Sequence, residues 1–310
     1  MSDALKPAAA GPSASDITKD GWIDRTVPAP LRPYLRLARI DRPIGAWLLL
    51  VPCWWGVALA AGPDPKTGWF YALFAVGALV MRGAGCTFND ITDRRLDARV
   101  ARTADRPIAS GQVGLTQAFL FLGLQFAVGL IVLLAFNRFV IALGVASLVL
   151  IFTYPFMKRI TWWPQAFLGV TFNWGVLMGW AAVHGGLGAA PLLLYAGGIA
   201  WTLGYDTIYA HQDKEDDALV GIHSTALLFA EGSRPWIAGF YGAAVTLFAL
   251  AGLAAGLGWS YYLLLALVAA QLGWQAARVD FDDPADCLAK FKSNRLAGWL
   301  LLAGLLLAPI

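Results

Sequence analysis

Charged side chains are scarce in this chain. Asp, Glu, Lys and Arg make up 14% of its 310 residues and hydrophobic residues make up 58%, whereas soluble domains hold about 25% and 45–50% of each kind. The mean hydropathy is +0.61. Too few polar residues are present to cover a surface in water. The composition therefore excludes an ordinary soluble fold and predicts a protein that uses lipid as its solvent.

Cysteine, histidine and excess charge are scarce as well. The three cysteines are scattered without the spacing of a disulfide framework or a metal site, and we interpret them as free thiols. The three histidines also lack ligand spacing. A formal net charge of +3 is too small to indicate nucleic acid as a partner. The lipid bilayer is the partner that this composition indicates.

Nine long apolar segments recur along the chain, each near the roughly 20 residues that an α-helix needs to cross a bilayer. Their approximate ranges are 43–61, 69–88, 115–136, 138–153, 163–183, 190–209, 235–257, 259–277 and 294–309. They predict one all-α integral membrane domain over residues 31–310. Residues 1–30 are rich in Ala, Pro and Ser and lack an apolar core. They resemble neither a signal peptide nor an Arg-rich transit peptide, so we expect a disordered cytoplasmic tail.

Positive charge is distributed asymmetrically. Lys and Arg gather in the tail and in the loops after the second, fourth, sixth and eighth segments, whereas Lys66 and Arg138 are alone on the opposite side. Cytoplasmic loops carry the excess of Lys and Arg. The pattern predicts nine transmembrane helices with a cytoplasmic N-terminus, and we expect the protein in a bacterial inner membrane.

Two connections on the cytoplasmic side stand out. The loops over residues 89–114 and 210–234 are long and rich in acidic and basic residues, whereas the connections on the other side are short. Each long loop follows an even-numbered segment, and the two loops are four helices apart. This spacing predicts two similar four-helix halves plus a ninth helix, with the function located where the two loops face each other.

The first of these loops opens with regularly spaced polar residues. Asn89, Asp93 and Asp97 recur at i, i+4 and i+8. If the second helix continues into the loop, they share one face and each lies about 6 Å further along the axis. Asp90 then points about 100° away.

The second loop holds a similar pattern in Asp206, Asp213 and Asp217. On a continuous helix, i+7 and i+11 return close to the direction of i. The three carboxylates would then share one face as well.

Two rows of carboxylates at one membrane depth repel each other and are costly beside lipid, so they need cations. Carboxylate and amide oxygens favour Mg²⁺, which keeps positions open for phosphate oxygens. The pattern predicts a diphosphate held by bridging Mg²⁺ between two helices. The alternative is that these are solvated loop charges, but two matched motifs four helices apart favour the site.

Basic residues accompany the acidic motifs, namely Arg102, Arg106, Lys158 and Arg159. Arginine contacts phosphate or carboxylate in bidentate geometry, and lysine acts as a point charge. The alternative is that they only keep their loops on the cytoplasmic side. For Lys158 and Arg159, a short loop otherwise made of Tyr, Pro, Phe and Met favours a role with the substrates.

Asn89-Asp90-x-x-Asp93-x-x-x-Asp97 and Asp213-x-x-x-Asp217 resemble the two acidic motifs of the UbiA superfamily of intramembrane aromatic prenyltransferases. Further segments resemble the branch of this family that acts on 4-hydroxybenzoate, namely residues 41–45, 102–107, 154–159, 205–213 and 221–226. Lysine is more usual in the family at the position of His223. The resemblance covers the chain from about residue 31 to its end.

The resemblance implies nine helices around a central cavity and a dependence on Mg²⁺. It also implies transfer of a polyprenyl group from polyprenyl diphosphate to the ring carbon ortho to the hydroxyl of 4-hydroxybenzoate, with release of diphosphate, as a step of ubiquinone biosynthesis. The acceptor and the pathway come from the resemblance alone.

We expect two Mg²⁺ ions on the diphosphate, with the ligands Asn89, Asp93, Asp213 and Asp217. Asp90, Asp97 and Asp206 are expected as further ligands or as neighbours of the ligands, and Asp90 or Asp206 as the base. Lys158 and Arg159 would take up charge on the leaving group. The substrate contacts that we expect are Arg42, Arg102, Arg106, Tyr154 and Tyr209, with Arg42 or Arg159 on the carboxylate of the acceptor.

Other classes of protein fit less well. A secondary transporter also has repeats and intramembrane charge, but it places that charge near the midplane, whereas these acids lie at the ends of helices. A magnesium channel would explain the acids but not the Arg and Lys beside them. Among enzymes, the alternative is a prenyltransferase with a naphthoate, homogentisate or haem acceptor.

Overall fold

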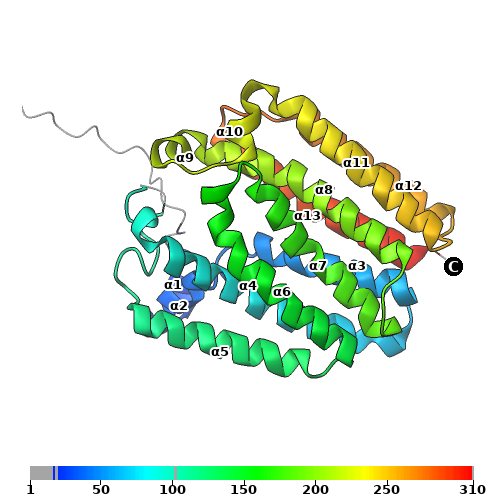
Figure 1. Cartoon of the computed structure of the whole chain (residues 1–310), viewed down its shortest axis with the longest axis horizontal. Coiled ribbons are helices and arrows are strands. Elements are labelled where there is room, and N and C mark those ends of the chain that lie inside the picture. The colour runs from blue at the N-terminus through cyan, green and yellow to red at the C-terminus, as the bar shows by residue number, and fades with distance from the viewer. Residues whose placement is uncertain (1–16, 18–19, 101–102, 309–310) are drawn as a thin grey trace, which may run out of the picture.

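The computed structural model describes residue 17, residues 20–100 and residues 103–308, except the side chains of residues 216 and 220. Every regular element within these residues is a helix (Figure 1). The long helices, of 18 residues or more, are α3 (Ile44–Ala61), α4 (Gly68–Asp97), α5 (Leu115–Leu133), α6 (Arg138–Ile160), α7 (Pro164–His184), α8 (Ala189–Ala210), α11 (Ser233–Ala254), α12 (Trp259–Arg278) and α13 (Pro284–Leu307). The short ones are α1 (Trp22–Thr26), α2 (Arg32–Leu37), α9 (Lys214–Val220), α10 (Thr225–Phe229) and the 3₁₀ turns η1 (Ala29–Leu31), η2 (Pro65–Thr67), η3 (His211–Asp213) and η4 (Ala230–Gly232).

The long helices pack in chain order into a closed ring. Each contacts the next one along the chain, and α13 returns to α3. Further contacts cross the ring, and the most extensive of them join α3 to α7 and α8 to α13. Figure 1 shows α3 to α6 in the lower part of the view and α8, α11 and α12 in the upper part. The all-α architecture is confirmed, while the central cavity and the similarity of the two halves stay predictions.

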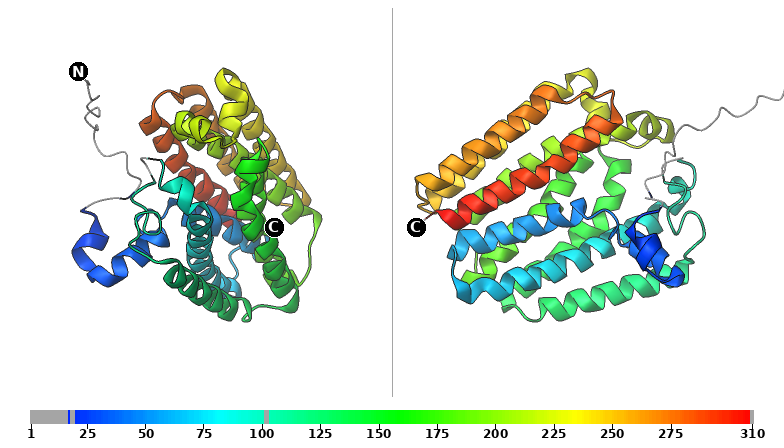
Figure 2. Two further views of the ribbon diagram at one scale, coloured as in Figure 1. Left: turned by 60° about the vertical axis from the view of Figure 1, so that its left-hand side comes forward. Right: turned by 180° about the vertical axis from the view of Figure 1, so that it is seen from behind.

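Six helical segments of the described chain are long and apolar enough to cross a membrane: Ile44–Ala61, Pro65–Asp97, Leu115–Leu133, Arg138–Ile160, Pro164–His184 and Thr225–Ala254. The helices α8, α12 and α13 do not meet this test, so the count of nine spans stays a prediction. In Figures 1 and 2 the end of α13 lies opposite to α1, α2 and α9. This placement is the one that an odd number of membrane crossings between α2 and the end of α13 would produce.

Part of the predicted tail is structured. Ile23 of α1 is only 2% exposed, and Asp24 accepts a hydrogen bond from Arg36 of α2 at 2.5 Å. Helical structure therefore begins before residue 31, because an apolar side chain and an ion pair hold α1 against α2. Residues 1–16 and 18–19 lie outside the described residues, and a disordered tail there stays a prediction.

Glycines set the distance between α3 and α7 at the centre of the ring. A Cβ added to Gly56 would meet the backbone of Val176, and one added to Gly179 would meet the backbone of Cys53. Small residues permit such close approach of helices in a membrane. A larger side chain at Gly56 or Gly179 would force the two helices apart.

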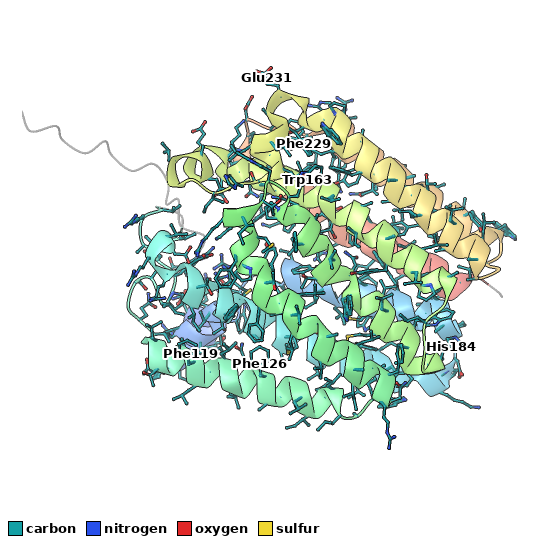
Figure 3. All side chains as sticks on the ribbon, viewed as in Figure 1. Phe119, Phe126, Trp163, His184, Phe229 and Glu231 are labelled. Atoms are coloured by element: carbon teal, nitrogen blue, oxygen red, sulfur yellow. The ribbon has the colours of Figure 1, made fainter. Side chains whose placement is uncertain are left out.

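Aromatic side chains gather at the end of the helices that carries the acidic motifs. Trp163, which precedes α7, lies 5.4 Å from Phe229 between ring centroids, and Phe229 stacks on Trp236 at 4.7 Å. Figure 3 shows Trp163 and Phe229 at the opposite end of α7 from His184. Because tryptophan prefers the membrane interface, this cluster marks one interface near the start of α7.

Candidate active site

The first acidic motif lies on a continuous helix, as the spacing predicts. Helix α4 runs without a break to Asp97. Its last turns carry Asp90, Asp93 and Asp97, which are 1%, 1% and 7% exposed. Buried carboxylates are costly unless cations or hydrogen bonds balance them, so the partners of these three groups define the site.

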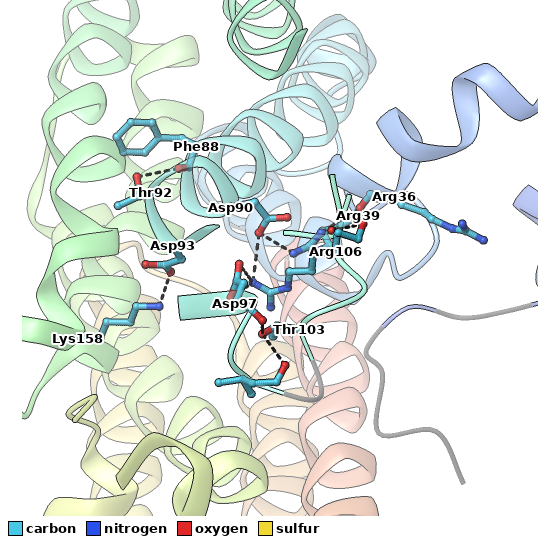
Figure 4. Close-up of polar contacts among 12 residues, drawn as sticks. Arg36, Arg39, Phe88, Asp90, Thr92, Asp93, Asp97, Thr103, Arg106 and Lys158 are labelled. Carbon is cyan, nitrogen blue, oxygen red and sulfur yellow. Dashed lines mark hydrogen bonds and ion pairs between the residues drawn. The ribbon is translucent and has the colours of Figure 1, made fainter. Parts of the chain in front are cut away.

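Asp93 is balanced by two basic residues of α6. The Lys158 ammonium donates to one carboxylate oxygen, and Arg159 Nη2 donates to the other at 2.6 Å. Figure 4 shows Lys158 reaching across from α6 to α4. Both basic residues lie in the last turn of α6 and not in a loop, because the apolar segment continues as helix through Pro155. The predicted proximity of this pair to the acidic motif is observed.

Asp90 and Asp97 share a different partner, Arg106. Its Nη1 lies 3.3 Å from Asp90 Oδ1 and 3.0 Å from Asp97 Oδ2 (Figure 4). Arg39 Nη2 also donates to Asp90, at 2.8 Å. The interpretation that groups Asp97 with Asn89 and Asp93 and sets Asp90 apart is wrong. An i+7 step is close to two full turns, so Asp90 and Asp97 point the same way.

The second acidic motif does not lie on one helix. Helix α8 ends at Ala210, the 3₁₀ turn η3 follows, and α9 begins at Lys214. Asp206 therefore belongs to α8, Asp213 to η3 and Asp217 to α9, and the prediction of one shared helical face is wrong. At Asp213 the backbone has φ −116° and ψ 10°, which interrupts the α-helical conformation.

Asp206 lies on α8 itself, before the break that separates it from Asp213 and Asp217. Arg82 of α4 and Tyr154 of α6 are both close enough to Asp206 to interact with it electrostatically. Tyr209, one turn further along α8, packs on Phe291 of α13 with ring centroids 4.5 Å apart. Asp206 and Tyr154 are thus near each other, whereas Tyr209 packs against α13.

The four metal ligands that we expected, Asn89, Asp93, Asp213 and Asp217, stay a prediction. Within the described residues, no group of three or more His, Cys, Asp or Glu side chains lies close enough to share a metal ion. Asp93 faces Lys158 and Arg159, while Asp213 and Asp217 lie on the broken segment after α8. The donor chemistry fits Mg²⁺, since carboxylate and amide oxygens are the ligands that this ion prefers. At Asp93 the ion would take the place of the two cationic partners, Lys158 and Arg159.

Two predicted substrate contacts need comment. Arg102 lies outside the described residues. Arg42 precedes α3, and its Nε lies 3.3 Å from Asp41 Oδ2. A neighbouring carboxylate thus faces Arg42.

Two functional candidates escaped the sequence analysis. Arg82 lies inside a membrane-spanning helix, with its guanidinium carbon 5.3 Å from the centroid of the Phe172 ring. Its Nε is buried and has no hydrogen-bond partner among the described residues. An arginine inside an apolar segment is costly and usually functional, which is a signal that would have identified it. Arg39 has a left-handed backbone with φ 58°, which no sequence pattern indicates.

The loop before α10 is joined to the basic end of α6. The backbone N–H of His223 donates to the carbonyl of Lys158 at 2.8 Å, and its ring stacks on Trp162 at 4.1 Å. Residues from the two halves of the chain thus meet at Lys158.

Solved structures with the same arrangement of helices show to which class of fold this protein belongs. A UbiA homologue from Aeropyrum pernix K1 has a TM-score of 0.72 at 26% identity, over 84% of this chain and 96% of that chain. A UbiA homologue from Archaeoglobus fulgidus bound to GPP and Mg²⁺ has a TM-score of 0.67 at 18% identity, over 88% and 98%. The second comparison shows a common fold.

Residues 49–308 match the UbiA prenyltransferase family, and the chain belongs to this family. Curated relatives are the mitochondrial 4-hydroxybenzoate polyprenyltransferases of Arabidopsis thaliana, Rattus norvegicus and Homo sapiens. The plant enzyme is 50% identical over 94% of this chain and 72% of its own length. The rat and human enzymes are 52% and 50% identical, over 92% of this chain and 77% of their own length.

These names correct the expected location. The prediction of a bacterial inner membrane is wrong by this comparison, because the relatives are named as mitochondrial enzymes of a plant and of animals. Composition indicates a membrane protein and the asymmetry of Lys and Arg predicts its orientation, but neither distinguishes one membrane from another.

Proposed function

We propose that this chain transfers a polyprenyl group from polyprenyl diphosphate to 4-hydroxybenzoate and releases diphosphate, as a step of ubiquinone biosynthesis. About 50% identity to the plant and human enzymes over more than nine-tenths of the chain supports this reaction. The observation that carries it is a buried carboxylate, Asp93, that faces Lys158 and Arg159 at the end of a membrane-spanning helix.

The diphosphate of the donor binds at Asp93 in this proposal. Asn89, Asp93, Asp213 and Asp217 would hold Mg²⁺, which when bound neutralises the diphosphate and stabilises it as a leaving group. A solved homologue with GPP and Mg²⁺ supports a divalent metal in this fold. With Asp93 bound to the metal, Lys158 and Arg159 would donate to diphosphate oxygens, because the charge of the carboxylate would already be balanced. These two side chains would hold the leaving group in place.

Arg106 and Arg39 keep Asp90 and Asp97 in fixed positions. Asp90 is 1% exposed and has two guanidinium partners, so a substrate cannot readily reach it. We therefore assign Asp90 and Asp97 to positioning the end of α4. Asp206 remains as the candidate base of the two that the sequence suggests.

The acceptor fits beside Arg82. A carboxylate would complete the hydrogen bonds of its guanidinium, whose buried Nε has no partner in the described structure, and the Phe172 ring lies against the same group. Arg42 and Arg159 are weaker candidates for this role, since each already lies within ion-pair distance of an aspartate.

The reaction balances with these groups. The bond between prenyl C1 and the diphosphate oxygen breaks, and its electron pair leaves with diphosphate. The ring carbon ortho to the phenol forms the new bond to C1. Asp206, near Arg82 and Tyr154, is placed to accept the ring proton that must leave. The prenyl tail stays in the bilayer, since each CH₂ prefers an apolar medium by about 0.8 kcal/mol.

The test is an assay of the purified protein in detergent with Mg²⁺, a polyprenyl diphosphate and a panel of aromatic acceptors. We expect prenylation of 4-hydroxybenzoate at the position ortho to its hydroxyl. Preference for a naphthoate or for homogentisate would refute the proposed acceptor but keep the family. Equal activity with a phenol that lacks the carboxylate would refute the role of Arg82.

A further inference from the structure

A groove of about 490 Å³ lies between α11 and α12, outside the site described above. Its lining residues are Arg234, Ala238, Tyr241, Gly242 and Val245 from α11, and Ala269, Leu272, Gly273, Ala276 and Ala277 from α12. Gly242 and Gly273 are exposed, so the groove opens to the surroundings of the helices. With α12 spanning the membrane as the sequence predicts, these surroundings are lipid.

The length of the groove matches one leaflet. From Arg234 to Val245 it follows about three turns of α11, or roughly 16 Å. Half of the hydrocarbon thickness of a bilayer is about 15 Å. The lining is apolar along this length except at Arg234, in the first turn of α11. A lipid lying here would have its headgroup at Arg234 and one chain running toward the midplane.

Arg234 provides a positive charge at the mouth of the groove. Its Nη1 and Nη2 donate to the carbonyls of Ala276 and Val279 at 2.6 Å and 2.8 Å, and the Phe281 ring lies 5.3 Å from its guanidinium carbon. These contacts fix the guanidinium against the C-terminal end of α12, whose carbonyls offset only part of its charge. Within the described chain, no carboxylate lies within ion-pair distance of Arg234. Its exposed, oriented charge is complementary to an anion.

We propose that the groove binds an anionic phospholipid, with one acyl chain between α11 and α12 and its phosphate at Arg234. Basic pockets between transmembrane helices bind anionic headgroups. An acyl chain gains little by leaving the surrounding lipid, so the selectivity must come from the charge at Arg234 and the shape of the groove. A prenyl diphosphate fits less well, because no acidic residue lines this groove to hold its metal.

The experiment measures thermal unfolding of the purified protein in detergent with added phosphatidylglycerol or phosphatidylcholine. We expect phosphatidylglycerol to raise Tm by roughly 5 °C at saturation and phosphatidylcholine to have little effect. Gly242→Leu and Gly273→Leu fill the groove, and a Cβ at either position meets no atom within 4 Å. Both variants should lose the shift, and Arg234→Gln should lose the preference for the anionic lipid.

Gly123→Leu is the matched control, since its site on α5 is equally open, and it should keep the full shift. Equal shifts with both lipids, or a full shift in both groove variants, would overturn the proposal. So would a higher Michaelis constant for prenyl diphosphate in those variants, which would indicate the prenyl tail, or loss of a dimer in light scattering, which would indicate a second copy. Native mass spectrometry of the unmodified protein must also retain phosphatidylglycerol, whether or not a variant folds.

Discussion

Arg106 joins two carboxylates that lie two turns apart on α4, with Nη1 at 3.3 Å from Asp90 Oδ1 and 3.0 Å from Asp97 Oδ2. The guanidinium comes from the segment after α4, so this contact folds that segment back over the end of the helix. Thr103 adds to it by donating to the carbonyl of Asp97 at 2.9 Å. Asp93 lies on the same turns, so the contacts of Arg106 and Thr103 with the end of α4 also help to position it.

Replacing Arg106 tests whether its contacts with Asp90 and Asp97 need the shape of arginine or only a positive charge. A lysine keeps the charge but lacks the planar, fixed fork of donors that orients arginine between two carboxylates. We expect Arg106→Lys to lower kcat/KM by about tenfold or more, roughly 1.4 kcal/mol of transition-state stabilisation. Arg95→Lys is the control, since Arg95 is exposed on the same helix, and it should match the wild type. Normal activity in Arg106→Lys would show that positive charge alone is sufficient.

Arg159 distinguishes a substrate role from a topological one. A topological role needs only positive charge, so Arg159→Lys would be silent. If the planar fork of Arg159 moves from Asp93 to the substrate, we expect about a tenfold loss of kcat/KM with normal insertion. The proposal also requires that the Michaelis constant rises for the prenyl diphosphate and not for the aromatic acid. A rise for the acid alone would instead assign Arg159 to its carboxylate.

Metal dependence follows from the oxygen donors of both motifs. We expect EDTA to abolish transfer and Mg²⁺ to restore it. Asp93→Ala and Asp213→Ala should each remove nearly all turnover. The double variant should be little worse than either single one, because groups that act as a unit are strongly non-additive. Independent, additive losses would show that the two motifs do not share a metal–diphosphate complex. Full activity in metal-free buffer would refute the dependence on a metal.

Local spacing predicted the elements of the site better than their pairing. The apolar segments and the continuation of α4 through Asp93 follow from periodicity, which the helix itself imposes. The face assignment of Asp97 failed because an i+8 step drifts about 80° from its starting direction. The break at η3 also escaped, since Ala210, His211 and Gln212 carry no Gly or Pro to signal it. Pairing of Lys158 with Asp93 depends on the packing of α6 against α4, which no local pattern fixes.

Arg82 was missed for a different reason. It is a single charged residue within an apolar segment, and one such residue does not change the number of spanning segments that hydropathy predicts. The burial of its Nε, its ring contact with Phe172 and its nearness to Asp206 become visible only when α4, α7 and α8 are placed together. The role of such a residue is decided by what it faces, and hydropathy contains no information on that.

Arg82→Gln therefore gives the sharpest test of the acceptor site. If Arg82 binds the carboxylate of 4-hydroxybenzoate, the neutral amide should raise the Michaelis constant for this acid by about tenfold or more, since charge-assisted bidentate contacts are the strong ones. The Michaelis constant for the prenyl diphosphate should stay within about twofold, because that group binds at the other end of the site.

The fold should tolerate this change. The Nε of Arg82 has no hydrogen-bond partner among the described residues, and a charge inside a spanning helix is costly. Loss of the positive charge near Asp206 offsets this gain, so the variant should unfold close to the temperature of the wild type. A phenol without a carboxylate provides the matched substrate, and wild type and Arg82→Gln should treat it alike. If Arg82→Gln weakens the phenol and the acid by the same factor, Arg82 supports the shape of the site and does not bind the carboxylate.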